Sequence, residues 1–223
     1  GLSHSNETIA ALQSSLTKLE QKYRHLADEI SKTRKQYANT LAAEITGLMQ
    51  TLGMQGGRFD IDITTDREAP PSLNGQDTIE FMVSANTGQP PRPLAKVASG
   101  GELARISLAL QVAAAGSTAI PTLIFDEVDS GIGGGIAEIV GQQLRSLGKS
   151  VQVLCVTHLP QVASRAHQHC LVDKQTHNGQ TTTRIQPLLD DSRTREIARM
   201  LGGVEITDNT LRHAQEMIDK AGI

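Results

Sequence analysis

Hydrophobic residues recur at alternating steps of three and four along the start of the chain. This seam first runs through Ile9, Leu12, Leu16, Leu19, Tyr23, Leu26 and Ile30. It weakens at Thr33 and resumes with a changed phase, as a stutter would produce, through Tyr37, Leu41, Ile45, Leu48 and Leu52. Charged side chains lie between the seam positions, so the pattern predicts a coiled-coil helix from about residue 5 to residue 52.

A single amphipathic helix with such a seam could instead lie on its own domain. The predicted length, roughly 70 Å at about 1.5 Å per residue, and the narrowness of the seam favour a coiled coil. No second heptad segment of matching length occurs in the 223 residues. We therefore expect the partner helix to lie upstream in a longer parent chain.

From residue 53 onward the pattern changes to mixed α/β. Apolar and polar residues alternate at 58–64 and 78–84, which predicts two half-exposed strands joined by a loop that holds prolines and an Asn-Gly pair. The remaining predicted elements are a helix at 101–115, a buried strand at 122–125, a helix at 132–147, a buried strand at 151–156, a hairpin at Asn178-Gly179, and helices at 193–201 and 208–221. The strand–helix–strand order predicts that the two buried strands are parallel and covered on both faces.

The helix predicted from residue 101 begins with two glycines, in the run Ser99-Gly100-Gly101-Glu102. Glycines let backbone N–H groups approach an anion closely, and a helix start supplies unsatisfied donors and a positive dipole end. Such a start suits a phosphate. The Ser-x-x-Glu spacing is also that of a plain capping box, and the four residues taken alone fit that interpretation better.

Chemically active side chains follow both predicted buried strands. Asp126 and Glu127 end the apolar run at 122–125, where one carboxylate can support a Mg²⁺ ion and the other can take a proton from an attacking water. His158 follows the strand at 151–156, and it could donate a hydrogen bond to the same phosphate. The alternatives are a solvated acidic pair and a histidine that caps the helix expected at Pro160.

Four ordered segments resemble the motifs of ATP-binding-cassette (ABC) ATPases. The matches are the signature motif at Ser99–Glu102, the Walker B strand at Leu123–Glu127, the D-loop at Val128–Gly131 and the switch histidine at His158. Within that family, residues 97–108, 124–133 and 155–163 are similar to the RecN family of bacterial DNA-repair ATPases, relatives of the structural-maintenance-of-chromosomes (SMC) proteins.

The resemblance implies a fold and a division of labour between two heads. The fold is the α/β carboxy-terminal lobe of an ABC-type ATPase head at residues 53–223, with a parallel sheet and flanking helices, attached to a coiled-coil arm segment at residues 1–52. By this resemblance we expect ATP to be held between two heads of a homodimer and its hydrolysis to serve double-strand break repair on DNA. The implied roles are contact with the other head's nucleotide for Ser99, Gly100, Gly101 and Glu102, Mg²⁺ support for Asp126, general base for Glu127, γ-phosphate contact for His158 and coupling of the two sites for Asp129.

One motif of the family is missing from the sequence. No Gly-x-x-x-x-Gly-Lys-Ser/Thr occurs, because the triplet Gly148-Lys149-Ser150 is preceded by Gln143 at the first glycine position and comes before a strand instead of after one. The resemblance implies that this Walker A loop lies in an amino-terminal half of the head. We therefore expect that half as a partner, and negligible ATP hydrolysis by the isolated chain.

Composition narrows the possible partners and locations. A net charge of −3, with 21 basic and 24 acidic residues, excludes a strong overall basic field, so DNA contact is local or made by the complete protein. An aromatic content of 2% leaves few rings on which single-stranded bases could stack. No signal peptide or membrane-spanning run is present, so we expect no membrane partner and a bacterial cytoplasmic, nucleoid-associated location with both cysteines reduced.

Two alternatives to a RecN-like head remain open. A transporter nucleotide-binding domain shares the motifs but would not carry a long heptad arm. A structural coiled-coil module would leave the ATPase motifs idle.

A weak zinc candidate at His167, His169 and Cys170, with His177 beyond, has poor geometry because His167 and His169 share one face of a strand while Cys170 points to the other.

Overall fold

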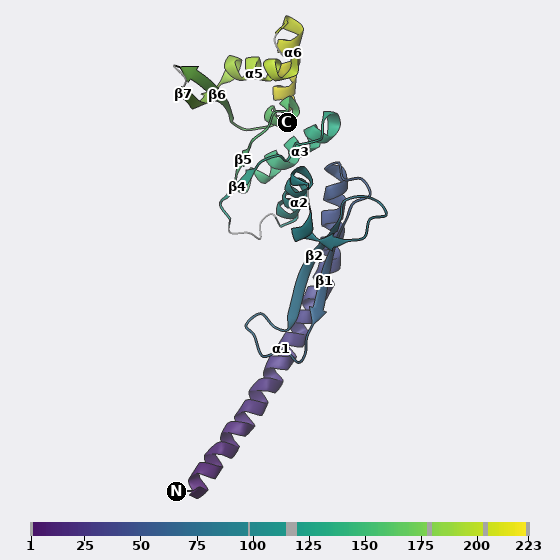
Figure 1. Ribbon diagram of the computed structural model, residues 1–223, viewed down its shortest axis with the longest axis vertical. Helices are drawn as coiled ribbons and strands as arrows, with labels where there is room; N and C mark the ends of the chain where they lie inside the picture. Colours follow the sequence, from purple (N-terminus) through teal and green to yellow (C-terminus); the bar gives the residue numbers. More distant parts are fainter. Residues whose placement is uncertain (1, 98, 115–119, 178–179, 203–204, 222–223) are drawn as a thin grey trace.

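The computed structural model describes the chain except for residues 1, 98, 115–119, 178–179, 203–204 and 222–223. Its longest element is helix α1 (Leu2–Thr51), which projects from the rest of the molecule as a single rod and confirms the predicted helix (Figure 1). Along the projecting part the seam residues are exposed, with Leu12 at 65% and Leu19 at 64%. No described residue covers them, as expected for a coiled-coil strand whose partner helix comes from another segment.

The second half of α1 packs on a small antiparallel sheet. Strands β1 (Arg58–Thr65) and β2 (Asp77–Ser84) form the predicted hairpin, and the short β3 (Arg92–Pro93) pairs with the end of β2. Ile45 and Met49 of α1 and Leu52, directly after its end, are fully buried with Phe59 of β1. The last turns of α1 therefore belong to the same core as the α/β part. The domain boundary predicted at residue 52 stays a prediction.

A polar network joins α1 to the root of the β1–β2 loop. Its centre is Asp77, whose side chain has 0% exposure and lies 3.1 Å from the Arg34 guanidinium. The same carboxylate accepts hydrogen bonds from Ser31 Oγ at 2.6 Å and Thr65 Oγ1 at 2.9 Å. Burial opposes ionisation of Asp77, but the Ser31, Thr65 and Arg34 bonds outweigh it and hold the pKa of the carboxyl below its usual value.

The central part of the chain confirms the predicted strand–helix–strand unit. After a 3₁₀ turn (Leu94–Lys96) come α2 (Gly100–Ala113), β4 (Thr122–Phe125), α3 (Gly134–Leu147) and β5 (Gln152–Cys155). Strands β4 and β5 pair in parallel, with Phe125 opposite Cys155. Helix α2 packs against both α1 and α3.

The prediction that this parallel pair is covered on both faces is wrong. Phe125 is buried, and Leu123 and Val153 pack on the core, but the opposite face is open. There Ile124 is 71%, Leu154 50% and Val156 63% exposed. An apolar run indicates that a face needs cover, and it does not say which chain segment supplies the cover.

The carboxy-terminal part forms a second, smaller packing unit. A short helix α4 (Pro160–Ala163) follows β5 and begins at Pro160 as predicted. The hairpin of β6 (His169–His177) and β7 (Gln180–Leu188) confirms the predicted pairing, although its Asn178-Gly179 turn lies outside the described residues. Helices α5 (Asp190–Gly202) and α6 (Asp208–Ala221) confirm the two predicted helices and pack around Ile197 and Ala214.

Hydrogen bonds fix the start of α5 to the end of α4. Arg193 Nη2 donates to the carbonyl oxygens of Ser164 at 3.0 Å and Ala166 at 2.7 Å, which binds α5 to the segment after β5. Across the described residues, each helix is too short or too polar to traverse a lipid bilayer.

Candidate functional site

The predicted phosphate-binding turn is the amino-terminal end of α2. Ser99 is its N-cap, in extended conformation, and its Oγ accepts a hydrogen bond from Glu102 N at 3.3 Å. Ser99 and Gly100 are exposed, whereas Gly101 is buried. Ser99 therefore caps α2, and Ser99 and Gly100 at its start remain exposed to solvent.

The two acids lie directly after β4, as predicted, and both are exposed. Glu127 has a φ of +59°, which costs a non-glycine residue on the order of 1–3 kcal/mol. This conformation turns its side chain toward α2, where a Cβ added to Gly100 would lie 2.4 Å from Glu127 Oε2. Glycine at position 100 therefore allows the carboxylate to reach the helix start, where the positive dipole end stabilises it.

The proximity of Glu127 and Gly100 was not anticipated from the sequence. The family resemblance assigns the helix start to one nucleotide and Glu127 to another, whereas here both contact each other within one chain. A residue with positive φ is not recognisable from composition or periodicity, so no sequence signal indicated this contact.

Asp129 joins the ends of the two parallel strands. Its side chain is only 2% exposed, and its Oδ2 accepts a hydrogen bond from Thr157 Oγ1 at 2.5 Å and from His158 N at 3.3 Å. The His158 Nδ1 atom lies 3.6 Å from the same oxygen, while the imidazole is 73% exposed. The predicted convergence of the β4 and β5 ends is thus present, with a buried carboxylate as the connection.

Two residues of the site were missed by the sequence analysis. Thr157 immediately precedes His158, and its hydroxyl is the shortest hydrogen-bond donor to Asp129. Arg105 falls within the helix predicted at 101–115, yet it is only 7% exposed and its Nη1 donates to Ser130 O at 2.8 Å. The available signal was position: Arg105 stands four residues after Gly101, so both lie on the same face of α2.

Cys155, the last residue of β5, does not provide a reactive thiol. Burial, reinforced by the carboxylates of Asp129 and Asp126, raises the pKa of the Cys155 thiol to about 12. The thiol therefore stays protonated near neutral pH, which makes it a poor nucleophile and a poor metal ligand. Cys155 is also partly buried and packs against the main core.

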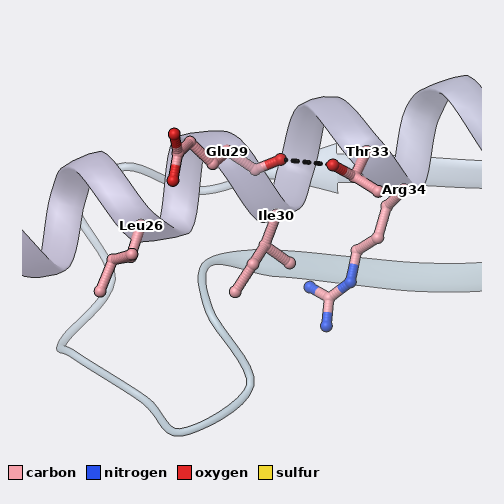
Figure 2. A pocket seen from close by; sticks show the side chains of 5 residues that line it. All are labelled: Leu26, Glu29, Ile30, Thr33 and Arg34. Carbon is pink, nitrogen blue, oxygen red and sulfur yellow. Dashed lines mark hydrogen bonds between the residues drawn. The ribbon is translucent and has the colours of Figure 1, made fainter.

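Neither the zinc candidate nor the surface hollows compete with this site. Among the side chains that the structure describes, no group of three or more His, Cys, Asp or Glu could hold a metal ion. A hollow of about 250 Å³ lies instead on the arm, where Leu26, Ile30 and Arg34 project from one side of α1 (Figure 2). Leu26 and Ile30 are seam residues, so this hollow belongs to the coiled-coil surface.

Proteins named DNA repair protein RecN resemble the chain over most of its length. The protein from Xylella fastidiosa is 48% identical over 199 residues, which cover 89% of this chain and 36% of that protein. The Vibrio cholerae protein is 48% identical over 214 residues, covering 96% of this chain and 38% of its own length. The Bacillus subtilis protein is 40% identical over 208 residues, covering 87% and 36% respectively. The chain thus spans 36–38% of the length of these relatives.

No protein-family model matches the chain. Among solved structures, an SMC head domain with a coiled coil and joint from Pyrococcus yayanosii is 18% identical with a TM-score of 0.49, covering 98% of this chain and 37% of that one. An SMC head bound to the C-winged helix domain of ScpA is 17% identical with a TM-score of 0.48, covering 76% and 49%. Because both scores are low, the family relationship rests on the curated relatives.

Proposed function

The chain belongs to the RecN family, and from that premise we propose that it is the carboxy-terminal part of an ATPase head that acts in DNA repair. The supporting observation is the junction at Asp129, which places Asp126, Glu127 and His158 at one edge of a parallel strand pair. Ligand sites of α/β proteins form at this edge. The relatives favour this function over a transporter domain, and we place the protein in the bacterial cytoplasm at the nucleoid.

The residues at this edge fit nucleotide hydrolysis with Mg²⁺. Asp126 is exposed, and its Oδ1 already accepts a hydrogen bond from Glu127 N at 2.9 Å, which orients the carboxylate. Carboxylate oxygens are the donors that Mg²⁺ prefers, so Asp126 would hold the ion, directly or through water. When bound, Mg²⁺ supplies charge neutralisation at the phosphates.

Glu127 and His158 would then act on the terminal phosphate of the nucleotide. Glu127 is the proposed general base, which takes a proton from the attacking water. His158 would donate a hydrogen bond to a γ-phosphate oxygen, and its 73% exposed imidazole leaves room for that contact. Asp129, through Thr157 and the His158 backbone, would hold the histidine beside the acids.

A complete site needs two more segments. The exposed face at Ile124, Leu154 and Val156 requires cover, and we propose that an amino-terminal half of the head supplies it together with the Walker A loop. The first turn of α2, with Ser99, Gly100, Gly101 and Glu102, would face the nucleotide of a second head in a homodimer. DNA would be contacted through the complete protein, because this chain carries a net charge of −3.

The first test replaces the proposed base in the complete protein. We predict that Glu127→Gln retains ATP binding and lowers kcat by about 10²- to 10⁴-fold, the usual contribution of general base catalysis. ATP binding is measured by fluorescence titration and turnover by phosphate release, both in the presence of Mg²⁺.

The control for this variant is Glu68→Gln, which makes the same chemical change on the exposed β1–β2 loop. It should leave both affinity and kcat unchanged. Normal hydrolysis by Glu127→Gln would remove Glu127 from the role of base, and loss of binding would show that the substitution disturbed the site as a whole.

A further inference from the structure

We propose that Arg105 is a positioning residue that fixes the loop after β4 to the first turn of α2 and thereby sets where Glu127 and Asp129 stand. The proposal deepens the proposed function and rests on it. Its starting point is a buried guanidinium whose stabilising contacts are fewer than its burial requires.

The contact between Arg105 and the loop is close and directional. Arg105 Nη1 donates to Ser130 O at 2.8 Å, and the residue is 7% exposed. Gly101, one turn earlier on α2, lies below the same loop: a Cβ there would stand 3.1 Å from Ser130 Cβ and from Ser130 O. The loop therefore rests on a glycine and is held by the arginine one turn away.

The burial of Arg105 is unfavourable for stability. Within the described part of the chain its guanidinium forms no ion pair with a carboxylate, and its Nε has no hydrogen-bond acceptor. Desolvation lowers the pKa of Arg105, although the charge of Glu102 partly opposes this effect. A buried charge without a full set of partners destabilises a fold, and an apolar side chain of similar volume is often as stable or more stable.

The residues that follow Arg105 on α2 include apolar side chains that pack in the core. Ile106, Leu108 and Ala109 are all fully buried on α2 and apolar. Arg105 instead carries a charge at a buried position of the same helix, and its hydrogen bond to Ser130 is the contact that distinguishes it from these neighbours.

The loop that Arg105 holds carries both chemical groups. Glu127, near its start, lies against Gly100, and Asp129, further along it, binds Thr157 and His158. Ser130 is adjacent to Asp129, so a displacement of the loop from α2 would move the base and the histidine together. The start of α2 is proposed to contact the nucleotide of another head, whereas Glu127 and His158 are proposed to act on the nucleotide of their own head. Arg105 connects these two parts of the site through its hydrogen bond to Ser130.

The test uses the complete protein with Arg105→Met, Arg105→Lys and the control Arg212→Met on the exposed face of α6. We expect Arg105→Met to lower kcat roughly tenfold, the effect of losing one hydrogen bond, while KM for ATP changes less than about threefold. The thermal midpoint should stay equal to that of the wild type or rise, because a methionine removes the buried charge. Arg105→Lys, which keeps a charged donor, should restore part of kcat, and Arg212→Met should change nothing.

Each alternative result has a separate meaning. A wild-type protein without ATP hydrolysis would refute the proposed function before Arg105 is considered. An active wild type together with wild-type kcat in Arg105→Met would overturn the positioning role. A parallel fall of kcat and thermal midpoint in Arg105→Met, with no recovery in Arg105→Lys, would assign Arg105 to folding alone and would also overturn it.

Discussion

Two charged side chains, those of Asp129 and Arg105, are buried within the site, and they differ in the number of their hydrogen-bond partners. Asp129 accepts two hydrogen bonds on one carboxylate oxygen, from Thr157 Oγ1 and His158 N. Arg105 makes one hydrogen bond and leaves Nε without an acceptor among the described atoms. Asp129 therefore stabilises the end of β5. Burial of the Arg105 charge is unfavourable for the stability of the fold, which indicates that Arg105 has a function.

The anchor at Asp129 yields a prediction for Thr157. Thr157→Val keeps the shape of the side chain but removes the hydroxyl, so a buried carboxylate loses its shortest donor. We expect a loss of about 1–3 kcal/mol of stability and a lower kcat, because the His158 backbone is held by the same oxygen. Thermal unfolding and phosphate release of the complete protein measure the two effects.

Thr157→Ser is the matched control, since it keeps the hydroxyl and deletes only a methyl group. It should retain most of the stability and of kcat. If Val and Ser gave equal losses in both measurements, the hydroxyl would not be the group that matters and the anchor would be wrong.

Sequence reasoning placed the candidate site residues at the ends of two parallel strands, but it did not predict their contacts. Asp126, Glu127 and His158 were found because each follows an apolar strand-like run, and parallel strands end at one edge. The burial of Arg105 and Asp129 could not be found in this way, because hydrophobic periodicity assigns charged residues to the surface. The φ of +59° at Glu127 is likewise a tertiary result that no local pattern encodes.

At the scale of elements, the root of the arm depends on one buried carboxylate. Asp77 lies on β2 and binds Ser31 and Arg34 of α1 across the sheet–helix junction. Arg34 Nη1 also donates to Asn74 O at 2.9 Å, and Tyr23 OH accepts from Ser72 N at 3.0 Å. These bonds fasten the β1–β2 loop along α1, so the direction of the arm is set by polar contacts as well as by the core below.

The lowered pKa of Asp77 predicts a pH dependence at this junction. Because the folded pKa lies below the unfolded value of about 3.9, ionised Asp77 stabilises the fold above that pH, and the stability is lost as pH falls through the folded pKa. Below about pH 4 the thermal midpoint should therefore drop in part through Asp77. Asp77→Asn should weaken the junction by about 1–3 kcal/mol at neutral pH. It should also reduce the fall of the thermal midpoint below about pH 4, which we call the acid limb.

Asp62→Asn provides the comparison for Asp77, because Asp62 lies on the neighbouring strand β1 with its side chain exposed. It should change neither the midpoint at neutral pH nor the acid limb. An acid limb that is equally steep in Asp77→Asn and in the wild type would show that other carboxyl groups control it.

The elements themselves were largely predictable, because their signals are local. The heptad seam, the alternation in β1 and β2 and the strand–helix–strand order each depend on neighbouring residues. The covering of β4 and β5 was predicted wrongly for the opposite reason. Ile124 and Leu154 are apolar because something must cover them, and which segment does so is not a local property.

At the scale of the whole molecule, two uncovered apolar surfaces have the same explanation. One is the seam on the projecting part of α1, and the other is the β4–β5 face at Ile124, Leu154 and Val156. Contiguous exposed apolar surface marks an interaction site. Both surfaces fit a chain that spans 36–38% of its relatives' length, and under the proposed function segments outside this chain would cover them.

We therefore predict negligible Mg²⁺-dependent ATP hydrolysis by the isolated chain, because its 223 residues contain no Gly-x-x-x-x-Gly-Lys-Ser/Thr to cradle the phosphates. Adding the upstream half of the head as a separate chain should cover Ile124, Leu154 and Val156 and raise phosphate release well above background. Glu127→Gln in this chain serves as the control, since it should abolish the gained activity while leaving the association of the two halves intact. Substantial turnover by the isolated chain that Glu127→Gln removes would mean that a second phosphate cradle exists within these residues.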